Sequence, residues 1–468
     1  MSPIRDSSGL ITHFVSTGRN VNGRIATENL LHHLAYYDEL TGLPNRKLFL
    51  KRHEDCIDSE IRDCHALVLL IDINNLKKIN DTLGHSAGDQ ALQIIAKRLD
   101  SFFETVTNTA RWGGDEFIVV VKDYGTTERA YSIARHLLDI VGAPLQLDTQ
   151  EVFLSASIGI ATYPDDATSA SELIRHAGLA LHLAKDTGRN EFLFYKESMS
   201  EKLDEDLRIE TALHSALEQN ELRLAYQPIV RSEDRIPVGV EALLRWHSPS
   251  FGEVPPSRFI PLLERSGQIV PIGRWVLQTA CSDIRRIQHR NATPLRLAVN
   301  ISARQLLHPS FVGDVKTILN ASGFAAELLE LEITESVLIE NAPVAAQVLG
   351  ELRAIGVHIS ADDFGTGYSS LNYLWKFPFN TLKIDKSFVS AMHGEPQARM
   401  IVGSILTLAK QFGLNVVAEG IETEAQYAAL KDLNCPLIQG YLTGRPEPIS
   451  ALEIRWAAPC SFQTIGQL

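Results

Sequence analysis

The segment VHISADDF at residues 357–364 shows the pattern that recurs through the C-terminal half, a short apolar stretch that ends in acidic side chains. Seven similar apolar segments, most of them separated by helical stretches, are LRLAYQPIV (222–230), VGVEALLRW (238–246), LRLAVNIS (295–302), LLELEIT (328–334), TLKID (381–385), LNVVAEG (414–420) and PLIQGY (436–441). About eight strands alternating with helices in roughly 235 residues are typical of a (β/α)8 barrel. The sequence therefore predicts an α/β fold, a TIM-like barrel, over residues 221–457.

Polar and charged side chains recur at the ends of these predicted strands. They are Glu241, Asn300, Glu332, Glu335, Asp362, Asp363, Lys383, Glu419, Glu422 and Gln439. A lone acid at a strand end is most often a satisfied core residue, but strand C-termini meet at one face of a barrel, where active sites lie. So many carboxylates repel one another unless cations bind between them. The pattern predicts a two-metal site, which clamps a phosphodiester for attack by water, with Lys383 orienting that water or stabilising negative charge.

These segments resemble the EAL phosphodiesterases over about 235 residues. The matching motifs are YQPIV (226–230), EALLRW (241–246), NIS (300–302), EITES (332–336), DDFGTGYSSL (362–371), KIDKSFV (383–389), AEGIET (418–423) and QGYLTGRPEP (439–448). The resemblance implies hydrolysis of cyclic di-GMP to linear pGpG with Mg²⁺ or Mn²⁺. This sequence departs from the family at Thr443, a position where Phe is frequent. The difference bears on substrate packing rather than on the chemistry.

The resemblance also implies roles for individual residues of the barrel. The implied metal ligands are Glu241, Asn300, Glu332, Asp362 and Glu419, with Asp363 reaching a second ion. Lys383 is implied to assist the attacking water, and Glu241 and Glu419 complete the catalytic set. Substrate contacts are implied for Gln227, Arg245 and Gln439. Coupling of substrate binding to dimerisation is implied for Glu335 and the loop 364–371, which includes Phe364, Gly365, Thr366 and Gly367.

Residues 38–197 show a different alternation of strands and helices, which predicts a separate α/β domain. The predicted elements are HALVLLIDI (65–73), AGDQALQIIAKRL (87–99), EFIVVV (116–121), TERAYSIARHLLDIV (127–141) and VFLSASIGIA (152–161). In RWGGDEF (111–117), Gly113 and Gly114 allow a tight turn that exposes backbone to a ligand. Asp115 and Glu116 follow that turn, and together with Asp72 they predict a site for Mg²⁺ and phosphates. A hairpin that merely carries a few acids is the alternative that these residues leave open.

The motifs DELTGLPNR (38–46), DINNLKKINDTLGHSAGDQ (72–90), RWGGDEF and AKDTGRN (184–190) resemble the GGDEF diguanylate cyclases. This family has a nucleotidyl-cyclase-like fold and makes cyclic di-GMP from two GTP molecules, one on each of two facing domains. The resemblance implies that Asp72, the Ile73 carbonyl and Asp115 hold Mg²⁺ with help from Glu116. It implies that Asn80 and Asp89 read the guanine, and that Lys185 and Arg189 neutralise the phosphates.

The resemblance leaves open whether this domain synthesises cyclic di-GMP or binds GTP and adjusts the barrel. The family's product-inhibition motif, RxxD, is replaced at its two defining positions by Glu104 and Thr107, so that inhibitory site is expected to be absent. Because synthesis needs two facing domains, the resemblance also implies a homodimer.

The remaining segments are interpreted as connections and as part of a further domain. Residues 1–25 contain one predicted strand at Ile11–Val15 without an evident partner, and they resemble the end of a PAS sensor domain. We therefore expect an upstream sensor, although a disordered tail is the alternative. Helices are predicted at 26–37 and, as an interdomain linker, at 198–220, with a tail at 458–468.

Composition narrows the class of protein. The 468 residues carry a net charge of -13, which argues against nucleic acid as the main partner. The five scattered cysteines form no CxxC pair, and no apolar stretch reaches the ~18 residues of a membrane helix, so a cytoplasmic location is expected.

A non-catalytic receptor for cyclic di-GMP or GTP is the alternative function. Such receptors usually lose a metal carboxylate, and none is lost here.

Overall fold

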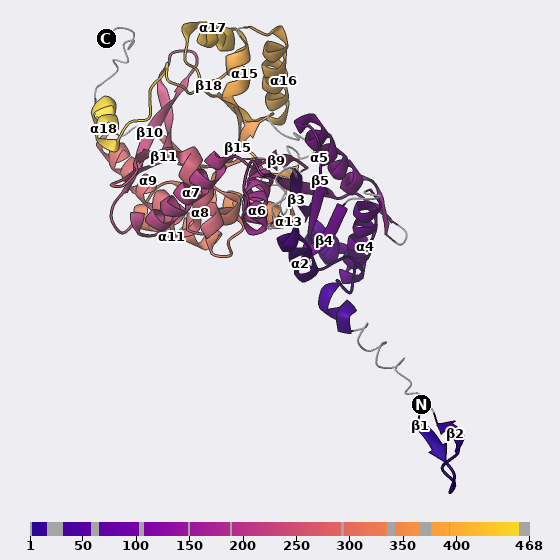
Figure 1. The fold of residues 1–468 in the computed structure, drawn as a ribbon. Helices are drawn as coiled ribbons and strands as arrows, with labels where there is room; N and C mark the ends of the chain where they lie inside the picture. The colour runs from indigo at the N-terminus through magenta and orange to yellow at the C-terminus, as the bar shows by residue number, and fades with distance from the viewer. Residues whose placement is uncertain are drawn as a thin grey trace. The chain divides into compact units, whose positions relative to one another are not determined.

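A computed structural model gives the fold and describes residues 2–15, 31–57, 65–102, 107–147, 150–187, 190–291, 294–334, 342–365, 376–392 and 394–457. The chain forms two compact units, residues 1–205 and 206–468 (Figure 1). The division falls inside helix α7 (Glu197–Ala216), where the sequence predicts the linker helix.

The first unit contains a five-stranded sheet in the order β4-β5-β3-β8-β9. Strand β3 is antiparallel to both β5 and β8, whereas β9 runs parallel to β8. The strands of this sheet are β4 (Thr107–Gly113), β5 (Glu116–Lys122), β3 (Ala66–Asn74), β8 (Ser155–Tyr163) and β9 (Phe192–Phe194). A separate two-stranded sheet consists of β6 (Leu145–Leu147) and β7 (Gln150–Val152).

Both faces of this sheet are buried, which explains the continuous apolar run of β3. Leu67, Leu69 and Ile71 belong to a core shared with α4 and α5, while Val68 and Leu70 belong to a core shared with α2 and α6. A strand that is covered on both faces loses the alternation of a half-buried strand. The helices are α2 (Arg46–Ile57), α3 (Leu76–Leu83), α4 (His85–Phe102), α5 (Thr127–Gly142) and α6 (Ala170–Thr187).

The N-terminal strand has a partner that the sequence prediction missed. Strand β2 (Ile11–Val15) pairs antiparallel with β1 (Ser2–Arg5), across a turn in which Asp6 accepts hydrogen bonds from the backbone of Ser8 and Leu10. Of the helix predicted at 26–37, residues 31–36 are helical, and 26–30 lie outside the described residues.

The second unit is a closed barrel of eight strands in its described part. The ring order is β10-β18-β17-β16-β15-β14-β13-β11, closed by pairing of β10 with β11, and β12 lies beside β11 outside the ring. The bounds are β10 (Leu222–Arg231), β11 (Pro237–Ser248), β12 (Gly252–Val254), β13 (Arg296–Asn300), β14 (Leu329–Thr334), β15 (His358–Phe364), β16 (Thr381–Ile384), β17 (Asn415–Ala418) and β18 (Leu437–Ile438).

One strand departs from a regular (β/α)8 barrel. Strand β10 is antiparallel to both of its neighbours, while the other pairs of the ring are parallel. Only residues 232–236 connect β10 to β11. A connection this short can join antiparallel strands but cannot make the crossover that parallel strands need.

Helices surround the barrel and share its main core (Figure 1). They are α8 (Pro256–Ser266), α9 (Ile269–Asn291), α10 (Ala303–Leu306), α11 (Phe311–Ser322), the 3₁₀ turn η1 (Ala326–Leu328), α13 (Ala342–Ile355), α15 (Lys386–Ala391), α16 (Pro396–Phe412), α17 (Glu424–Asp432) and α18 (Ile449–Ala457). Throughout the described part of the chain, each helix is too short or too polar to span a membrane.

Candidate active site

Lys383 lies at the centre of the acidic cluster in the barrel. Its Nζ lies 2.6 Å from Glu419 Oε1 and 2.8 Å from Glu332 Oε2. Asp362 Oδ1 and Glu241 Oε2 lie farther away, at 3.3 Å and 3.9 Å. The lysine side chain is only 2% exposed, so its charge is screened little by water. The barrel therefore brings together four carboxylates that the sequence places on four different strands or strand ends.

Glu241 is fixed by two side-chain amides, one from the adjacent strand β13 and one from the residue that follows β18. Asn300 Nδ2 donates to Glu241 Oε1, and Gln439 Nε2 donates to Glu241 Oε2, both at 2.6 Å. Gln439 Nε2 also lies 3.2 Å from Gln227 Oε1, and Gln227 stands directly opposite Glu241 in the β10–β11 pairing. Four residues predicted from the sequence thus form one hydrogen-bonded set: Gln227, Glu241, Asn300 and Gln439.

Asp362 and Asp363 lie where the pairing of β15 with β16 is interrupted. The register shifts between Ala361 and Phe364, and Asp363 has a left-handed backbone with φ of 53°. A bulge redirects side chains that would otherwise alternate across a strand, and Asp tolerates this conformation better than most residues. The bulge therefore allows two adjacent acids to serve the same site.

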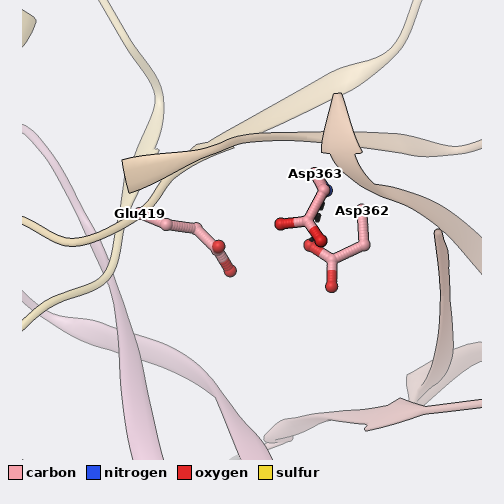
Figure 2. Close-up of side chains that lie close together, drawn as sticks. All are labelled: Asp362, Asp363 and Glu419. Carbon is pink, nitrogen blue, oxygen red and sulfur yellow. Dashed lines mark hydrogen bonds between the residues drawn. The ribbon is translucent and has the colours of Figure 1, made fainter. Parts of the chain in front are cut away.

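Asp362, Asp363 and Glu419 form a cluster with the spacing of a metal site. Each offers a carboxylate oxygen, and these oxygens lie within 4.8 Å of one another. Figure 2 shows the two aspartates side by side, with Glu419 facing them from another part of the chain. Oxygen ligands of this kind suit Mg²⁺ and Mn²⁺, so the donor set fits the divalent ion that the sequence predicts.

Burial and neighbouring charges shift the pKa values of Lys383 and of the acids around it. Burial opposes the charged form of Lys383, but the surrounding carboxylates outweigh it and raise its pKa well above the ordinary value. Burial and the neighbouring acids raise the pKa of Glu332 well above its usual range and that of Glu419 to about 7. Burial also opposes ionisation of Glu241, yet Lys383, Gln439 and Asn300 hold its pKa below the ordinary value. Beside a single lysine, Glu332 and Glu419 are thus harder to ionise than usual, and a bound cation would favour their charged forms.

Two cavities adjoin the cluster. The first, of about 260 Å³, is lined by Glu241, Asp362, Lys383, Glu419 and Tyr441, among others. The second, of about 470 Å³, lies between β11, β13 and helices α8 and α9, and its lining includes Arg245 and Asn300. Since Asn300 also donates to Glu241, the second cavity borders the cluster.

The first unit contains a smaller acidic site at the end of β3. Asp72 stands opposite Glu116 in the β3–β5 pairing, and the Ile73 amide donates to the Asp115 carbonyl at 3.1 Å. Lys185 Nζ, on α6, lies 2.6 Å from Asp72 Oδ2. Burial raises the pKa of Asp72 and of Glu116 above their ordinary values. The structure therefore brings together the three predicted acids and Lys185, which come from two strands, a turn and a helix.

Arg111 fixes the glycine turn next to this site. Its Nη1 lies 3.0 Å and 3.1 Å from the two carboxylate oxygens of Asp38, and its Nη2 donates to the Gly114 carbonyl at 2.7 Å. Gly114 has a φ of 54°, a conformation that glycine adopts without strain. The contact joins two of the motifs recognised in the sequence, DELTGLPNR and RWGGDEF, into one substructure.

Asp38→Asn is expected to lower the stability of the first unit by about 1–2 kcal/mol at neutral pH, because it removes a charge-assisted hydrogen-bond pair. Burial opposes ionisation, but hydrogen bonds from Thr41 and the pair with Arg111 lower the pKa of Asp38 below its ordinary value. The stabilisation is therefore present above the ordinary pKa and disappears as pH falls through the lower one. Thermal melts between pH 3 and 7 should show a difference that shrinks towards pH 3; a constant difference would contradict this account.

The predicted guanine-reading residues lie on two adjacent helices. Asn80, on α3, packs so closely against Gly88 of α4 that a Cβ at Gly88 would lie 1.9 Å from Asn80 Oδ1. Asp89 follows Gly88 and is exposed.

The loop predicted to couple substrate binding to dimerisation begins at Phe364. Phe364 is buried and Gly365 packs against Phe388. Arg189, Glu335, Thr366 and Gly367 lie outside the described residues.

Several residues around these sites escaped the sequence prediction. The Arg46 guanidinium lies 4.5 Å from the centre of the Trp112 ring, directly before the glycine turn. Lys386 and Tyr441 line the cavity of the carboxylate cluster, and Arg445 stacks on Tyr441. Lys386 and Arg445 lie inside quoted motifs, KIDKSFV and QGYLTGRPEP, so their basic character near the predicted phosphodiester site was the available signal.

Comparison with known proteins matches both halves of the chain. A model of the EAL domain matches residues 210–446, and a model described as diguanylate cyclase, GGDEF domain, matches residues 35–191. The cyclic di-GMP phosphodiesterase NbdA of Pseudomonas aeruginosa is 39% identical over 90% of this chain and 54% of its own length. The bifunctional diguanylate cyclase/cyclic di-GMP phosphodiesterase MucR of the same organism is 41% identical over 90% of this chain and 61% of its own length.

A solved structure titled PaMucR phosphodiesterase, c-di-GMP complex, is 42% identical with a TM-score of 0.51, covering 52% of this chain and 99% of that chain. The Vibrio cholerae LapD S helix-GGDEF-EAL structure has a TM-score of 0.60 at 19% identity, covering 89% of this chain and 98% of that chain, and thus shares the fold. The chain spans a little over half the length of the two curated relatives.

Proposed function

Because the chain belongs to the family of proteins that join a GGDEF domain to an EAL domain, we propose that its barrel hydrolyses cyclic di-GMP to linear pGpG. The observation that carries this proposal is the acidic cluster around the buried Lys383, in which no family ligand is missing. The names of the relatives, a cyclic di-GMP phosphodiesterase and a bifunctional cyclase/phosphodiesterase, support the same reaction.

Glu241, Asn300, Glu332, Asp362 and Glu419 would hold the metal, and Asp363 would reach a second ion. A bound Mg²⁺ or Mn²⁺ would supply a Lewis acid and an activated water. Lys383, held among the carboxylates, would orient that water and stabilise negative charge on the phosphate. The amides of Asn300 and Gln439 keep Glu241 ionised and in place, so that it can act as a ligand.

The substrate would occupy both cavities beside the cluster. Arg245 lines the larger cavity, whereas Gln439 lines the smaller one beside Gln227. Apolar side chains such as Ile260 and Ile272 line the larger cavity and suit the face of a purine. The complex of PaMucR with c-di-GMP, which has a 42% identical chain, supports this choice of substrate.

Purified protein with Mn²⁺ is expected to consume cyclic di-GMP, and EDTA is expected to stop the reaction. Binding of cyclic di-GMP without metal-dependent turnover would overturn the proposal and support the alternative, a non-catalytic receptor.

For the first unit we propose GTP binding with Mg²⁺ at Asp72, the Ile73 carbonyl and Asp115. Glu116 would assist the second ion, and Lys185, now paired with Asp72, would turn to the phosphates. The exposed backbone of Gly113 and Gly114 would approach the nucleotide. Asn80 and Asp89, together at the α3–α4 junction, would read the guanine edge, whose two adjacent N–H groups suit a carboxylate. Arg189 would complete the phosphate contacts.

A Glu241→Ala variant, in which degradation is blocked, separates synthesis from regulation in this unit. Cyclic di-GMP formed from GTP by that variant would establish diguanylate cyclase activity. GTP binding without product would assign the domain a regulatory role, and absence of both would overturn this part of the proposal.

We further propose that the chain works as a cytoplasmic homodimer under an upstream sensor. The functional boundaries would be 38–197 for the GGDEF domain and 221–457 for the EAL domain, with residues 1–25 as a PAS remnant. Glu335 and the loop containing Phe364, Gly365, Thr366 and Gly367 would couple substrate binding to dimerisation. Replacement of the linker at 198–220 by a Gly/Ser segment should abolish any effect of GTP on hydrolysis; an unchanged effect would contradict this coupling.

A further inference from the structure

The loop that follows β18 is held in place by a dense set of contacts. The Gln439 amide donates to the Ala418 carbonyl at 2.8 Å, and a Cβ at Gly440 would lie 2.2 Å from the Ile421 carbonyl oxygen, so only glycine fits. Thr443 donates to the Gly440 carbonyl through its amide and, at 3.0 Å, through its hydroxyl. Gln227 donates to the Gly444 carbonyl at 3.1 Å. The loop is therefore fixed to Gln227 and Gln439, and Gln439 in turn donates to Glu241.

The hydroxyl of Thr443 shows what this chain gains by carrying Thr where Phe is frequent in the family. Phenylalanine, which is frequent at this position in the family, cannot donate the bond to Gly440. In this chain the loop is stabilised from within by that hydrogen bond, and the aromatic surface next to the site comes from other residues.

That surface consists of Tyr441 and Arg445. Tyr441 lines the cavity of the carboxylate cluster and is 53% exposed. The Arg445 guanidinium carbon lies 4.5 Å from the centre of the Tyr441 ring.

We propose that Tyr441 and Arg445 form a stacking platform for a guanine base of the substrate. This inference rests on the proposed hydrolysis of cyclic di-GMP and adds two specificity-determining residues to it. A guanidinium stacked on a ring presents a broad, planar, cationic face, which suits an electron-rich purine. Because the platform borders the cavity of the metal ligands, a base held there keeps its attached phosphate close to the cluster.

The test compares Tyr441→Ala, Tyr441→Phe, Arg445→Gln and Arg445→Lys with a matched control. Arg235 lies 4.0 Å above the ring of Tyr427, away from the described site, so Arg235→Gln removes an equivalent stack. For each variant, kcat and KM are measured with cyclic di-GMP and with bis(p-nitrophenyl) phosphate, a diester without a purine. Calorimetry in EDTA, which is expected to stop hydrolysis, measures the Kd of cyclic di-GMP independently of turnover.

Tyr441→Ala is expected to raise the KM and Kd for cyclic di-GMP about tenfold, as loss of one base stack does. Tyr441→Phe keeps the ring, so its KM and Kd should remain within about threefold of the wild type. Arg445→Gln and Arg445→Lys should weaken binding alike, because both lose the planar guanidinium. Cleavage of bis(p-nitrophenyl) phosphate and the Arg235→Gln control should stay at wild-type levels.

Unchanged KM and Kd in Tyr441→Ala would overturn the platform. Wild-type KM and Kd in Arg445→Lys, beside a loss in Arg445→Gln, would also overturn the platform. A lysine can replace a phosphate contact but not a planar stack. Equal losses with both substrates would assign the residues a structural role instead. Failure of the wild type to cleave cyclic di-GMP would refute the proposed function itself, and the Kd values would still decide whether the base stacks there.

Discussion

Lys383→Met is expected to reduce hydrolysis of cyclic di-GMP by at least about 10³-fold and to destabilise the metal-free second unit by about 3–5 kcal/mol. The lysine is the buried counter-ion of Glu332, Glu419, Asp362 and Glu241. Methionine preserves the length of the side chain but leaves these acids without their positive partner. Some of them would then take up protons, which limits the loss of stability but removes the charge on the ligands.

Divalent metal provides the readout that is specific to this explanation. Thermal melts with and without Mn²⁺ should show a larger metal-induced increase in Tm for Lys383→Met than for the wild type, because the ion replaces the missing cation. Lys410→Met serves as the control, since Lys410 is exposed near the end of α16. Wild-type stability of metal-free Lys383→Met would show that Lys383 does not balance these acids.

Glu419→Gln is the second substitution with a large expected effect. It keeps the size of the side chain but removes a charge from the cluster of Asp362, Asp363 and Glu419. We expect hydrolysis to fall by at least about 10³-fold, with Mn²⁺ affinity at least about tenfold weaker, because an amide is a poorer metal ligand than a carboxylate. Calorimetric titration with Mn²⁺ and steady-state kinetics measure the two effects separately.

Glu424→Gln is the matched control for this variant. Glu424 lies five residues further along the chain, at the start of α17, where it forms an exposed ion pair with Arg235. It should retain both Mn²⁺ affinity and turnover. An active Glu419→Gln variant with normal metal binding would remove Glu419 from the proposed ligand set.

The sequence predicts the barrel well because its strands are short apolar segments, most of which carry a polar residue at or near the end, and this pattern is local. The same reasoning brings Glu241, Glu332, Asp362, Lys383 and Glu419 to one face, since parallel strands end together. Family motifs then provide roles that spacing alone does not. The burial of Lys383 among acids confirms that these residues meet, while their roles in metal binding and hydrolysis remain predictions.

Other features depend on contacts between distant residues or on exact connection lengths. The antiparallel β10 follows from the short 232–236 connection, which the regular strand pattern concealed. The pairing of β1 with β2 was missed because Ser2–Arg5 has little apolar character. The stack of Arg445 on Tyr441 needs the turn at Gly440 and Thr443, whose geometry is set by Ile421 and Gln227. No local pattern reports such contacts.

The central claim is that the carboxylate cluster of the barrel is a phosphodiesterase site. Incubation of the protein with cyclic di-GMP and Mn²⁺ in H₂¹⁸O, followed by chromatography and mass spectrometry, tests it most directly. The account predicts pGpG as the initial product, with one ¹⁸O atom in its 5′-phosphate, and no product in the presence of EDTA or in Glu419→Gln. Cyclic di-GMP recovered intact from the wild type, or cleavage that survives EDTA, would contradict it.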